Sequence, residues 1–489
     1  MADVGARLAG VVEDVRSGAD VAEEYGHDEA LSTALVRPAY VVRPRTAEEV
    51  AAVLRVATEE RVPVTARGCG TGLSGGAIPS ANGIVVSFER MNAVLEIDTD
   101  NHVAVVQPGV TLRELDERTA AAGLVYPVYP GELSASLGGN VATNAGGMRA
   151  VKYGVTRHHV LGLEAVLPTG EVLRTGGKFV KSSTGYDLTQ LIVGSEGTLA
   201  LVTEATLKLR PRIRHNATVL APFRDLAGVT AAVPEVVASG LAPLILEYID
   251  GLTMGAITYT ADLQLGVPDE VRDTAQAYLV VMLENREQDR LDADVEAAGQ
   301  LLSDLGAIDV YVLPGGAARK LVEARERAFH TAKAAGADDV IDTVVPRAAL
   351  PAFMAEVTTI AQANETFIVG CGHAGDGNVH LALFQKDPDK RATVLKALFA
   401  AAMTLGGAIS GEHGLGRTKR RYFLDLEDPA KLALLHRIKH AFDPAGILNP
   451  GVLLDSTPDD GTLEDGTPDG STPDGSTARD GGDHHEGQV

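Results

Sequence analysis

Residues 67–76 read RGCGTGLSGG, and they directly follow the strand-like run VPVTA at residues 62–66. A glycine-rich loop after a strand lets consecutive backbone N–H groups turn toward one ligand, which is how many proteins cradle a phosphate. Residues 70–75 satisfy the pattern G-x-G-x-x-G, but proline, asparagine and glycine follow within residues 79–83 where a helix would have to continue. The sequence therefore predicts a diphosphate-binding loop that is not part of a Rossmann βαβ unit.

Two further glycine-rich segments lie downstream of this loop. They read PGELSASLGGNVATNAGGMRAVKYG at residues 130–154 and GSEGTLALVT at residues 194–203. One such cluster is as consistent with tight turns as with a ligand, but three together favour an extended ligand wrapped by the backbone. The chain has no G-x-x-x-x-G-K-[ST] motif, so we do not expect a nucleoside triphosphate in a P-loop.

Strand-like runs alternate with glycine-rich turns and a few amphipathic helices between residues 40 and 211, as in an α+β domain. Thr46 and Thr111 each stand three residues before a glutamate, which is the capping-box pattern, and predict helices that run to about residues 60 and 122. The strands expected between these helices are 62–66, 83–88 and a hairpin over 93–107.

A second α/β region is expected from about residue 213 to residue 453. Helical patterns such as DADVEAAGQLLSDLG at residues 292–306 alternate there with strand-like runs such as AYLVVML at residues 277–283 and DVYVL at residues 309–313. The longest apolar stretch, residues 397–409, is interrupted by a threonine and two glycines, and it is too short to span a membrane. We interpret it as a core helix that ends at Gly406.

The composition of the 489 residues excludes several classes of protein. A net charge of -23 and the lack of a basic stripe argue against nucleic acid as a partner. Only two cysteines, Cys69 and Cys371, are present, so neither a disulfide framework nor a cysteine-based zinc site is expected. The N-terminus lacks the basic and apolar regions of a secretion signal. We expect a soluble, cytoplasmic protein without a membrane span, and attachment to the periphery of a membrane stays open.

The last part of the chain, residues 454–489, is rich in Pro, Gly, Ser, Thr and Asp and has few apolar residues to bury, so we expect it to be disordered. It carries ten acidic residues and one arginine, a net charge of -9, which leaves -23 minus -9, or -14, for the rest of the chain. We assign no role to its His484-His485 pair.

Residues 369–384, VGCGHAGDGNVHLALF, predict two strands joined by a tight type I′ turn at Asp376-Gly377. Counting outward from that turn places His373 directly opposite His380, with their Cβ atoms about 5 Å apart. Two imidazoles on one face of a hairpin can share a metal ion. Alone, this motif would favour histidines that only make hydrogen bonds within the sheet.

A third ligand is available in SGEHGLG, where Gly411 and Gly414 flank Glu412 and His413. The glycines permit a bend that directs both side chains to one site, whereas in a straight strand the two would diverge. Two histidines and a carboxylate with open coordination positions are typical of a catalytic metal site for zinc, manganese or iron. The sequence therefore predicts a divalent metal held by His373, His380 and Glu412.

These segments together resemble the FAD-linked D-2-hydroxyacid dehydrogenases of the vanillyl-alcohol-oxidase type, which include the D subunit of glycolate oxidase and D-lactate dehydrogenases. The resemblance covers residues 40–453, and all its motifs occur in family order. The motifs are RGCGTGLSGG, PGELSASLGGNVATNAGG, IVGSEGTLALVTEATLKL, GHAGDGNVH, GEHGLG and FDPAGILNPG.

The resemblance implies the architecture of the whole chain. An N-terminal helical segment at residues 1–39 precedes a FAD-binding domain of the PCMH type at residues 40–213. An α/β substrate and metal-binding domain follows at residues 214–453, and its C-terminal segment returns to the flavin. The fold class is therefore α+β, and the acidic tail begins at residue 454.

The resemblance also implies where FAD binds. The diphosphate is expected on residues 67–74, with residues 130–147 and Gly197 nearby, and Asn449 approaching the flavin ring. Relatives usually have alanine where Cys69 stands, which we interpret as a neutral substitution, and the loop has no histidine for a covalent flavin link, so FAD is expected to be noncovalent. The predicted cofactor-binding residues are Arg67, Gly68, Cys69, Gly70, Thr71, Gly72, Ser74, Pro130, Gly131, Ser136, Gly138, Gly139, Thr143, Asn144, Gly146, Gly147, Tyr153, Gly154, Glu196, Gly197 and Asn449.

By the same resemblance, His413 is the catalytic base and Arg325 binds the substrate carboxylate. The implied reaction oxidises a small D-2-hydroxy acid, with D-lactate or glycolate favoured, to the 2-keto acid. The hydroxyl and one carboxylate oxygen chelate the metal, His413 removes the hydroxyl proton, and hydride moves from the alpha carbon to flavin N5.

Several alternatives stay open at this point. D-2-hydroxyglutarate is a competing substrate, and a non-catalytic FAD subunit for electron transfer is a competing function. An ether-lipid synthase or a cell-wall precursor reductase on the same scaffold is disfavoured by the paired histidines and the Glu-His motif. The electron acceptor is expected to be a quinone, a cytochrome or a partner subunit, and a homodimer is also open.

Overall fold

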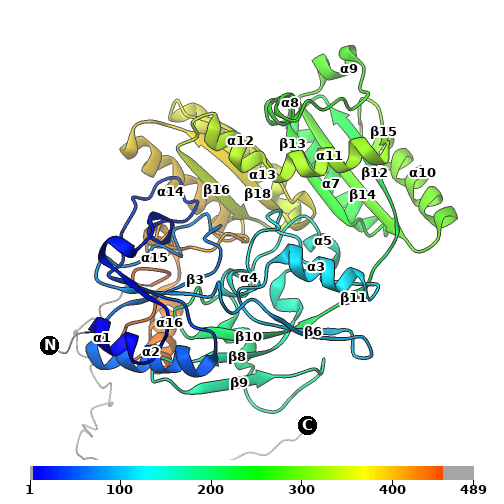
Figure 1. The fold of residues 1–489 in the computed structure, drawn as a ribbon. Helices are drawn as coiled ribbons and strands as arrows, with labels where there is room; N and C mark the ends of the chain where they lie inside the picture. The colour runs from blue at the N-terminus through cyan, green and yellow to red at the C-terminus, as the bar shows by residue number, and fades with distance from the viewer. Residues whose placement is uncertain (1–3, 455–489) are drawn as a thin grey trace, which may run out of the picture. The chain divides into compact units, whose positions relative to one another are not determined.

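The computed structural model describes residues 4–454 (Figure 1). The acidic tail from residue 455 onward and its His484-His485 pair lie outside the described residues. Within the described part, no helix has the length and apolar character needed to cross a membrane. The apolar stretch interpreted as a core helix belongs to α14 (Pro388–Thr404), and Gly406 follows it with a left-handed φ of 79°.

The first sheet contains the strand that leads into the glycine loop. Its order is β1-β2-β4-β3, with β2, β4 and β3 parallel. The capped helix predicted after Thr46 is confirmed, because the Thr46 side chain accepts a hydrogen bond from Glu49 N at the start of α2 (Ala47–Glu60). The strands are β1 (Val15–Ser17), β2 (Tyr40–Val42), β3 (Val64–Arg67) and β4 (Ile84–Ser87).

The N-terminal segment expected to be helical is only partly so. It contains α1 (Val4–Ala9), but β1 then pairs antiparallel with β2 and adds an edge strand to the first sheet. Just before β1, the buried carboxylate of Asp14 lies 2.5 Å from Arg43 Nη2 and 3.2 Å from Arg90 Nη1, and these ion pairs tie the start of β1 to the segments that follow β2 and β4.

The second sheet is antiparallel, with the order β5-β6-β10-β8-β9. The predicted hairpin is confirmed as β5 (Val94–Asp98) and β6 (Val103–Val106), and the predicted capping box of Thr111 and Glu114 opens α3 (Leu112–Ala120). The remaining elements are β7 (Leu124–Val125), α4 (Leu137–Thr143), α5 (Ala150–Tyr153), β8 (Val160–Val166), β9 (Val172–Gly176), α6 (Leu188–Ile192), β10 (Leu201–Lys208) and β11 (Arg210–Pro211).

A seven-stranded antiparallel sheet forms the centre of the second half, with the order β15-β12-β14-β13-β17-β18-β16. We propose that the two domains divide near residue 213, because the large sheet begins just after it. The strands are β12 (His215–Phe223), β13 (Ile245–Asp250), β14 (Ala277–Asn285), β15 (Tyr311–Leu313), β16 (Asp339–Val344), β17 (Phe367–Gly372) and β18 (Asn378–Phe384).

Helices cover both faces of the large sheet. Alternate residues of each strand point to opposite faces, and one face packs under α7 (Leu226–Ala238), α10 (Gln288–Asp304), α13 (Leu350–Ala363) and α14. The other face packs under α8 (Gly251–Thr260) and α11 (Gly315–Glu326), and this face carries the candidate site. The remaining helices are α9 (Asp269–Thr274), α12 (Ala328–Ala334), α15 (Arg420–Leu426) and α16 (Pro429–Phe442).

The chain returns to the first sheet after α16, as expected (Figure 1). Leu448 forms a parallel bridge with Val64 of β3, and Ile447 and Leu448 are buried among the apolar residues of that sheet. The same neighbourhood holds Asn449, whose backbone N–H donates to Val64 O at 2.7 Å. The C-terminal segment is thereby fixed beside the strand that leads into the glycine loop.

Candidate active site

The β17–β18 hairpin brings His373 and His380 together, but in a register that differs from the predicted one. His380 pairs with Cys371, not with His373, because a short 3-10 turn at Ala374–Asp376 replaces the predicted two-residue turn. The observed pairing register differs from the predicted one by two residues. Because this is an even number, the two histidine side chains still point to the same face of the sheet. The two imidazole rings consequently still meet, with centroids 4.8 Å apart.

Glu412 completes the predicted group of metal ligands. Its Oε1 lies 3.0 Å from His373 Nε2 and 3.2 Å from His380 Nε2, so one carboxylate oxygen faces a nitrogen of each ring. All three side chains are largely buried. The structure thus brings together the three residues that the sequence predicted as ligands.

Glu247 of β13 contacts two predicted site residues, although no sequence motif indicated it. It is buried, and its two carboxylate oxygens face different partners: Oε1 lies 2.5 Å from His373 Nδ1, and Oε2 lies 2.8 Å from Arg325 Nη2. Arg325, on α11, is buried too, and its Nε has no hydrogen-bond partner among the described residues. An acid inside the apolar run ILEYID was the available signal, because a buried acid needs a partner.

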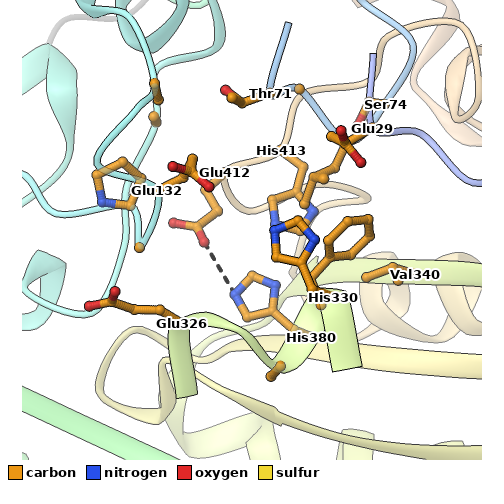
Figure 2. A pocket seen from close by; sticks show the side chains of 18 of the residues that line it. Glu29, Thr71, Ser74, Glu132, Glu326, His330, Val340, His380, Glu412 and His413 are labelled. Carbon is orange, nitrogen blue, oxygen red and sulfur yellow. Dashed lines mark ion pairs between the residues drawn. The ribbon is translucent and has the colours of Figure 1, made fainter. Parts of the chain in front are cut away.

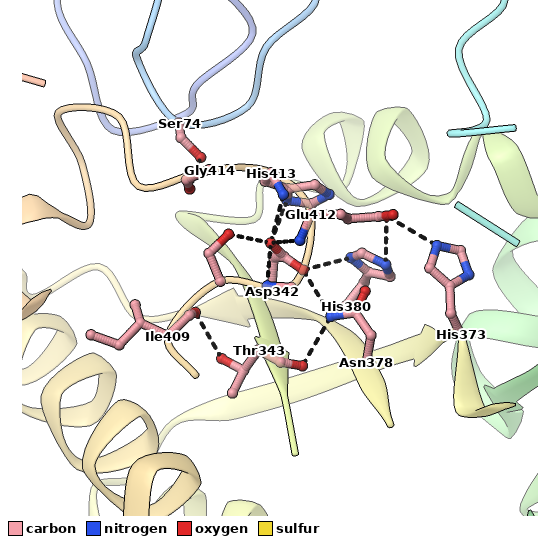
Figure 3. A network of polar contacts seen from close by, with 12 residues as sticks. Ser74, Asp342, Thr343, His373, Asn378, His380, Ile409, Glu412, His413 and Gly414 are labelled. Carbon is pink, nitrogen blue, oxygen red and sulfur yellow. Dashed lines mark hydrogen bonds and ion pairs between the residues drawn. The ribbon is translucent and has the colours of Figure 1, made fainter. Parts of the chain in front are cut away.

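Asp342 of β16, which the sequence reasoning also missed, holds the Glu412 loop in place (Figure 3). It is fully buried, and its Oδ2 accepts hydrogen bonds from Ser410 Oγ and from the backbone N–H groups of residues 411, 412 and 413, at 2.7 to 3.1 Å. Its Oδ1 accepts a hydrogen bond from Asn378 Nδ2 at 2.8 Å. The bend expected from the flanking glycines is therefore stabilised chiefly by one carboxylate.

His413, the predicted base, stacks on His380 with ring centroids 4.9 Å apart. Its Nδ1 lies 3.9 Å from Asp342 Oδ2, and no described residue gives that nitrogen a hydrogen bond. Burial lowers the pKa of His413 to about 4. At neutral pH its imidazole is therefore unprotonated, as a base must be.

The two carboxylates beside His373 favour a cation at this place. Burial lowers the pKa of His373, but the carboxylates of Glu247 and Glu412 outweigh this effect and raise it to about 10. His380 Nε2 is buried and has no hydrogen bond of good geometry with any described residue. Two imidazoles and a carboxylate whose ligand atoms lie within 4.8 Å of one another match the donor set of a zinc, manganese or iron site.

A second group with metal-binding spacing shares His380 with the first one. It consists of Asp342, His380 and His413. The oxygens of Asp342 already accept the hydrogen bonds that hold the loop. The residues present therefore fit a metal between His373, His380 and Glu412 better.

One cavity of about 690 Å³ joins the metal-ligand group to the glycine loops (Figure 2). Ligand sites of this kind typically measure about 300–1,000 Å³. Of the predicted site residues, the lining includes Gly68, Cys69, Gly70, Thr71, Gly72, Ser74, Pro130, Gly131, Ser136, Gly139, Thr143, Gly146, Glu196, Gly197, Arg325, His373, His380, Glu412 and His413. The predicted residues outside the lining are Arg67, Gly138, Asn144, Gly147, Tyr153, Gly154 and Asn449.

The first glycine loop fits a diphosphate. Within residues 4–454, no protein group accepts a hydrogen bond from the backbone N–H of Gly70, Thr71 or Gly72, and all three residues line the cavity. Consecutive free N–H groups form an anion-binding concavity. The first turn of α4 differs, because Val110 O, Pro108 O and Ser136 Oγ accept hydrogen bonds from its N–H groups.

Several predicted residues outside the cavity have packing roles. A side chain at Gly138 would overlap Pro108, one at Gly147 would overlap the Tyr129 carbonyl, and one at Gly154 would overlap the His158 ring. These glycines are thus explained by close packing, and direct contact with a cofactor is not needed to account for them.

Arg67, Asn144, Tyr153 and Asn449 position other segments. Arg67 Nη1 donates to His27 O at 2.7 Å, Asn144 Oδ1 accepts from Arg157 N at 2.9 Å, and the Tyr153 hydroxyl donates to Glu284 of β14. Asn449 Nδ2 donates to Gly76 O and to Glu196 O at 2.9 and 2.8 Å.

Glu196 links the first domain to the segment that follows His413. Its carboxylate accepts hydrogen bonds from Leu415 N and Gly416 N at 2.9 and 2.8 Å, and burial raises its pKa. Ser74 Oγ donates to Gly414 O at 2.9 Å nearby. The glycine loop and the Glu412 loop therefore hold each other in place.

Comparison with known families and structures identifies the two halves of the chain. Residues 38–176 match the FAD binding domain family, and residues 212–453 match the family of FAD linked oxidases, C-terminal domain. The fold resembles the structure of p-cresol methylhydroxylase, with a TM-score of 0.73 at 17% identity over 92% of this chain and 96% of that one. The predicted fold class, a PCMH-type FAD-binding domain followed by a C-terminal domain, is confirmed.

The chain also has relatives along nearly its whole length. It is 61% identical to an uncharacterized FAD-linked oxidoreductase of Mycobacterium tuberculosis, over 94% of this chain and 100% of the relative. It is 37% identical to a D-lactate dehydrogenase of Anaerostipes hadrus, over 89% and 93%, and 37% identical to the glycolate oxidase subunit GlcD of Bacillus subtilis, over 85% and 88%. The chain therefore belongs to the family of FAD-linked oxidoreductases that includes these D-lactate dehydrogenases and glycolate oxidase subunits.

Proposed function

We propose that this protein oxidises small D-2-hydroxy acids, with D-lactate or glycolate as the favoured substrates, to 2-keto acids. The observation that carries the proposal is the shared cavity, in which Arg325 and the His373–His380–Glu412 group face the glycine loops. A carboxylate anchor and a base beside a cation site are what the oxidation of a 2-hydroxy acid requires. The relatives named for D-lactate and glycolate support the same substrate class.

The bound groups supply chemistry that side chains lack. When bound, FAD would supply a hydride acceptor, and a divalent cation, zinc, manganese or iron, would supply a Lewis acid for the substrate hydroxyl. Residues 70–72 would hold the FAD diphosphate, and His373, His380 and Glu412 would hold the cation. We propose noncovalent FAD, since neither residues 67–76 nor the adjoining strand contains a histidine.

Arg325 orients the substrate. Its guanidinium is permanently charged and planar, which suits a carboxylate, and its buried Nε is free to donate. Glu247 fixes Arg325 on one side and His373 on the other, so a single carboxylate sets the distance between the substrate anchor and the cation site.

His413 takes the hydroxyl proton. Its Nδ1 is turned toward Asp342, which leaves Nε2 as the atom that accepts the proton from the substrate. After the transfer, the imidazolium lies near the ionised Asp342 carboxylate, whose pKa is depressed: burial raises it, but His413, Lys419 and His380 outweigh this. A nearby carboxylate stabilises the charged ring and so favours the transfer.

The electron acceptor is proposed to lie outside the chain and to be a quinone, a cytochrome or a partner subunit. The two cysteines cannot provide the four thiolates of an iron–sulfur cluster. One relative is named as a subunit of glycolate oxidase, which supports a partner subunit as the electron acceptor.

Turnover by the purified protein tests the proposal. With an artificial dye as electron acceptor, D-lactate should yield pyruvate and glycolate should yield glyoxylate, and a chelator should abolish both reactions until divalent metal is restored. If no keto acid forms from any D-2-hydroxy acid with FAD and metal both bound, the proposal is wrong.

A further inference from the structure

One wall of the cavity is a strip of apolar side chains on the large sheet, next to His380. His380 pairs with Cys371, the next rung on this face pairs Ala382 with Val369, and the rung after that pairs Phe384 with Phe367. Val340 of β16 lies opposite Ala382 on the other side. We call Val340, Phe367, Val369, Ala382 and Phe384 the apolar wall, and all five line the cavity.

The apolar wall is long enough to hold more than a methyl group. Phe384 stands four positions after His380, and a strand rises about 3.3 Å per residue, so the wall extends about 13 Å from the metal-ligand group. Ile257 of α8 and Phe329 and Ala332 of α12 also line the cavity. Apolar side chains from a sheet and from two helices thus border the same space.

The charges of the cavity disfavour a second carboxylate on the substrate. Arg325 is the only arginine or lysine among the described residues that line it, and Arg325 is committed to the carboxylate beside the alpha carbon. The other charged side chains of the lining include Glu132 and Glu326, which offer no positive charge to a second carboxylate, and Glu29, which is already paired with Lys333 Nζ at 2.6 Å. His330 of α12 also lines the cavity and is exposed. In the view of Figure 2, Val340 lies on the opposite side of His380 and His413 from Glu326.

We infer that the preferred substrate carries an uncharged, apolar group of several carbons beyond its alpha carbon, and that this group lies against the apolar wall. The inference rests on the proposed function, because the alpha carbon is placed between Arg325 and the metal-ligand group. It makes D-lactate the smallest chiral member of the substrate series and excludes D-2-hydroxyglutarate as the preferred substrate.

The apolar wall belongs to the second domain, whereas the surfaces that fit the FAD diphosphate belong to the glycine loops of the first domain. In this inference, the remainder of a ligand held at Arg325 extends along the wall. Burial of one methylene contributes about 0.8 kcal/mol, which is about a fourfold gain in kcat/KM for each added carbon. An unpaired carboxylate on the same wall should lower kcat/KM by about 100-fold or more.

The test is the kcat/KM of the FAD- and metal-loaded protein for D-2-hydroxy acids of increasing length. The series runs from glycolate and D-lactate through D-2-hydroxybutyrate and D-2-hydroxyhexanoate to D-2-hydroxyoctanoate, with D-2-hydroxyglutarate as the charged comparison. We expect kcat/KM to rise about fourfold per carbon from D-lactate to D-2-hydroxyhexanoate, and D-2-hydroxyglutarate to fall at least about 100-fold below D-2-hydroxyhexanoate.

A variant that narrows the cavity beside the apolar wall tests whether the substrate chain lies there. Ala382→Leu fills the first rung beyond His380, so the ratio of kcat/KM for D-2-hydroxyhexanoate to that for D-lactate should fall at least about tenfold. Ala355→Leu makes the same chemical change at an exposed position on α13 and should leave this ratio as in the wild type. Bound FAD and the unfolding midpoint of both variants show that they are folded.

The outcomes separate the inference from the proposed function. Oxidation of D-lactate with no gain from longer acids, or a preference for D-2-hydroxyglutarate, would overturn the inference and leave the proposed function in place. Gain with length that Ala382→Leu does not reduce would also overturn it, since the chain would then lie elsewhere. If no acid of the series is oxidised, the proposed function itself is wrong.

Discussion

At the scale of single residues, Glu247 joins two predicted site residues although no motif indicated it. One buried carboxylate contacts both a predicted metal ligand, His373, and the predicted substrate anchor, Arg325. Partners of this kind fix the orientation of a ligating histidine and raise its basicity. The two roles of the site are therefore coupled through one side chain.

Glu247→Gln keeps the shape of the side chain and removes its charge. We expect the affinity for the divalent metal to fall about 10- to 100-fold, and KM for D-lactate to rise because Arg325 loses its partner. Metal titration of the FAD-loaded protein gives the first quantity, and steady-state kinetics give the second. Glu235→Gln, at an exposed position on α7, is the matched control. Wild-type metal affinity in the Glu247 variant would show that the contact between Glu247 and His373 does not contribute to metal binding.

His413→Asn removes the proposed base. Turnover of D-lactate should fall by at least about 100-fold, whereas bound FAD and bound metal should stay at wild-type levels, because His413 is neither part of the glycine loops nor one of the three proposed ligands. Flavin and metal content per chain, measured beside kcat, make this distinction. Undiminished turnover in this variant would remove His413 from the mechanism.

The sequence could indicate His373, His380, Glu412 and His413 because they stand in two short motifs with constrained turns. It could not indicate Glu247 or Asp342, because their partners are distant in the sequence and lie on other strands, on α11 or in the loop at residues 410–413. Glu247 lies 126 positions from His373 in the sequence, and Asp342 lies 71 positions from His413. The signal in the sequence was an acid inside an otherwise apolar strand, and this signal does not identify the partner of that acid.

At the scale of elements, the β17–β18 hairpin shows which part of a register prediction is robust. The turn was predicted as two residues, and the structure has a 3-10 turn that ends at Gly377 with a φ of 74°. His380 therefore pairs with Cys371, whereas the predicted turn would have paired it with His373. The shared face survived because the displacement was an even number of residues.

Gly377→Ala tests the contribution of this turn. The added Cβ would overlap the Val345 carbonyl oxygen, and alanine disfavours the left-handed conformation. We expect the free energy of unfolding to fall by more than about 1 kcal/mol and metal to be retained less well. Gly18→Ala is the control, because its φ is also positive but nothing lies within 4 Å. Equal losses in both variants, measured by urea unfolding, would show that the turn contact does not matter.

The glycine segments illustrate the limit of reading loops from composition. All three border the cavity, yet the individual glycines are required for different reasons. Gly70 and Gly72 line the cavity with free N–H groups, whereas Gly138 and Gly147 are required by the close approach of Pro108 and Tyr129. A glycine count cannot separate these cases, because both need a missing side chain.

At the scale of the whole molecule, the site exists only where the domains meet. The first domain supplies the glycine loops, the large sheet supplies His373 and His380, and the segment after α16 returns to β3. The Thr46 cap, the Thr111 capping box and the Asp98–Val103 hairpin were predictable locally. The order of seven strands in the large sheet was not, because long-range pairing leaves no local signal.

The most direct test of the account is the visible flavin absorbance of the purified, metal-loaded protein without oxygen, before and after addition of D-lactate or L-lactate. The account predicts that D-lactate bleaches the flavin, that L-lactate does not, and that removal of the metal by a chelator abolishes the bleaching until divalent metal is restored. Bleaching by L-lactate as fast as by D-lactate, bleaching that survives complete metal removal, or no bleaching by any D-2-hydroxy acid would contradict it.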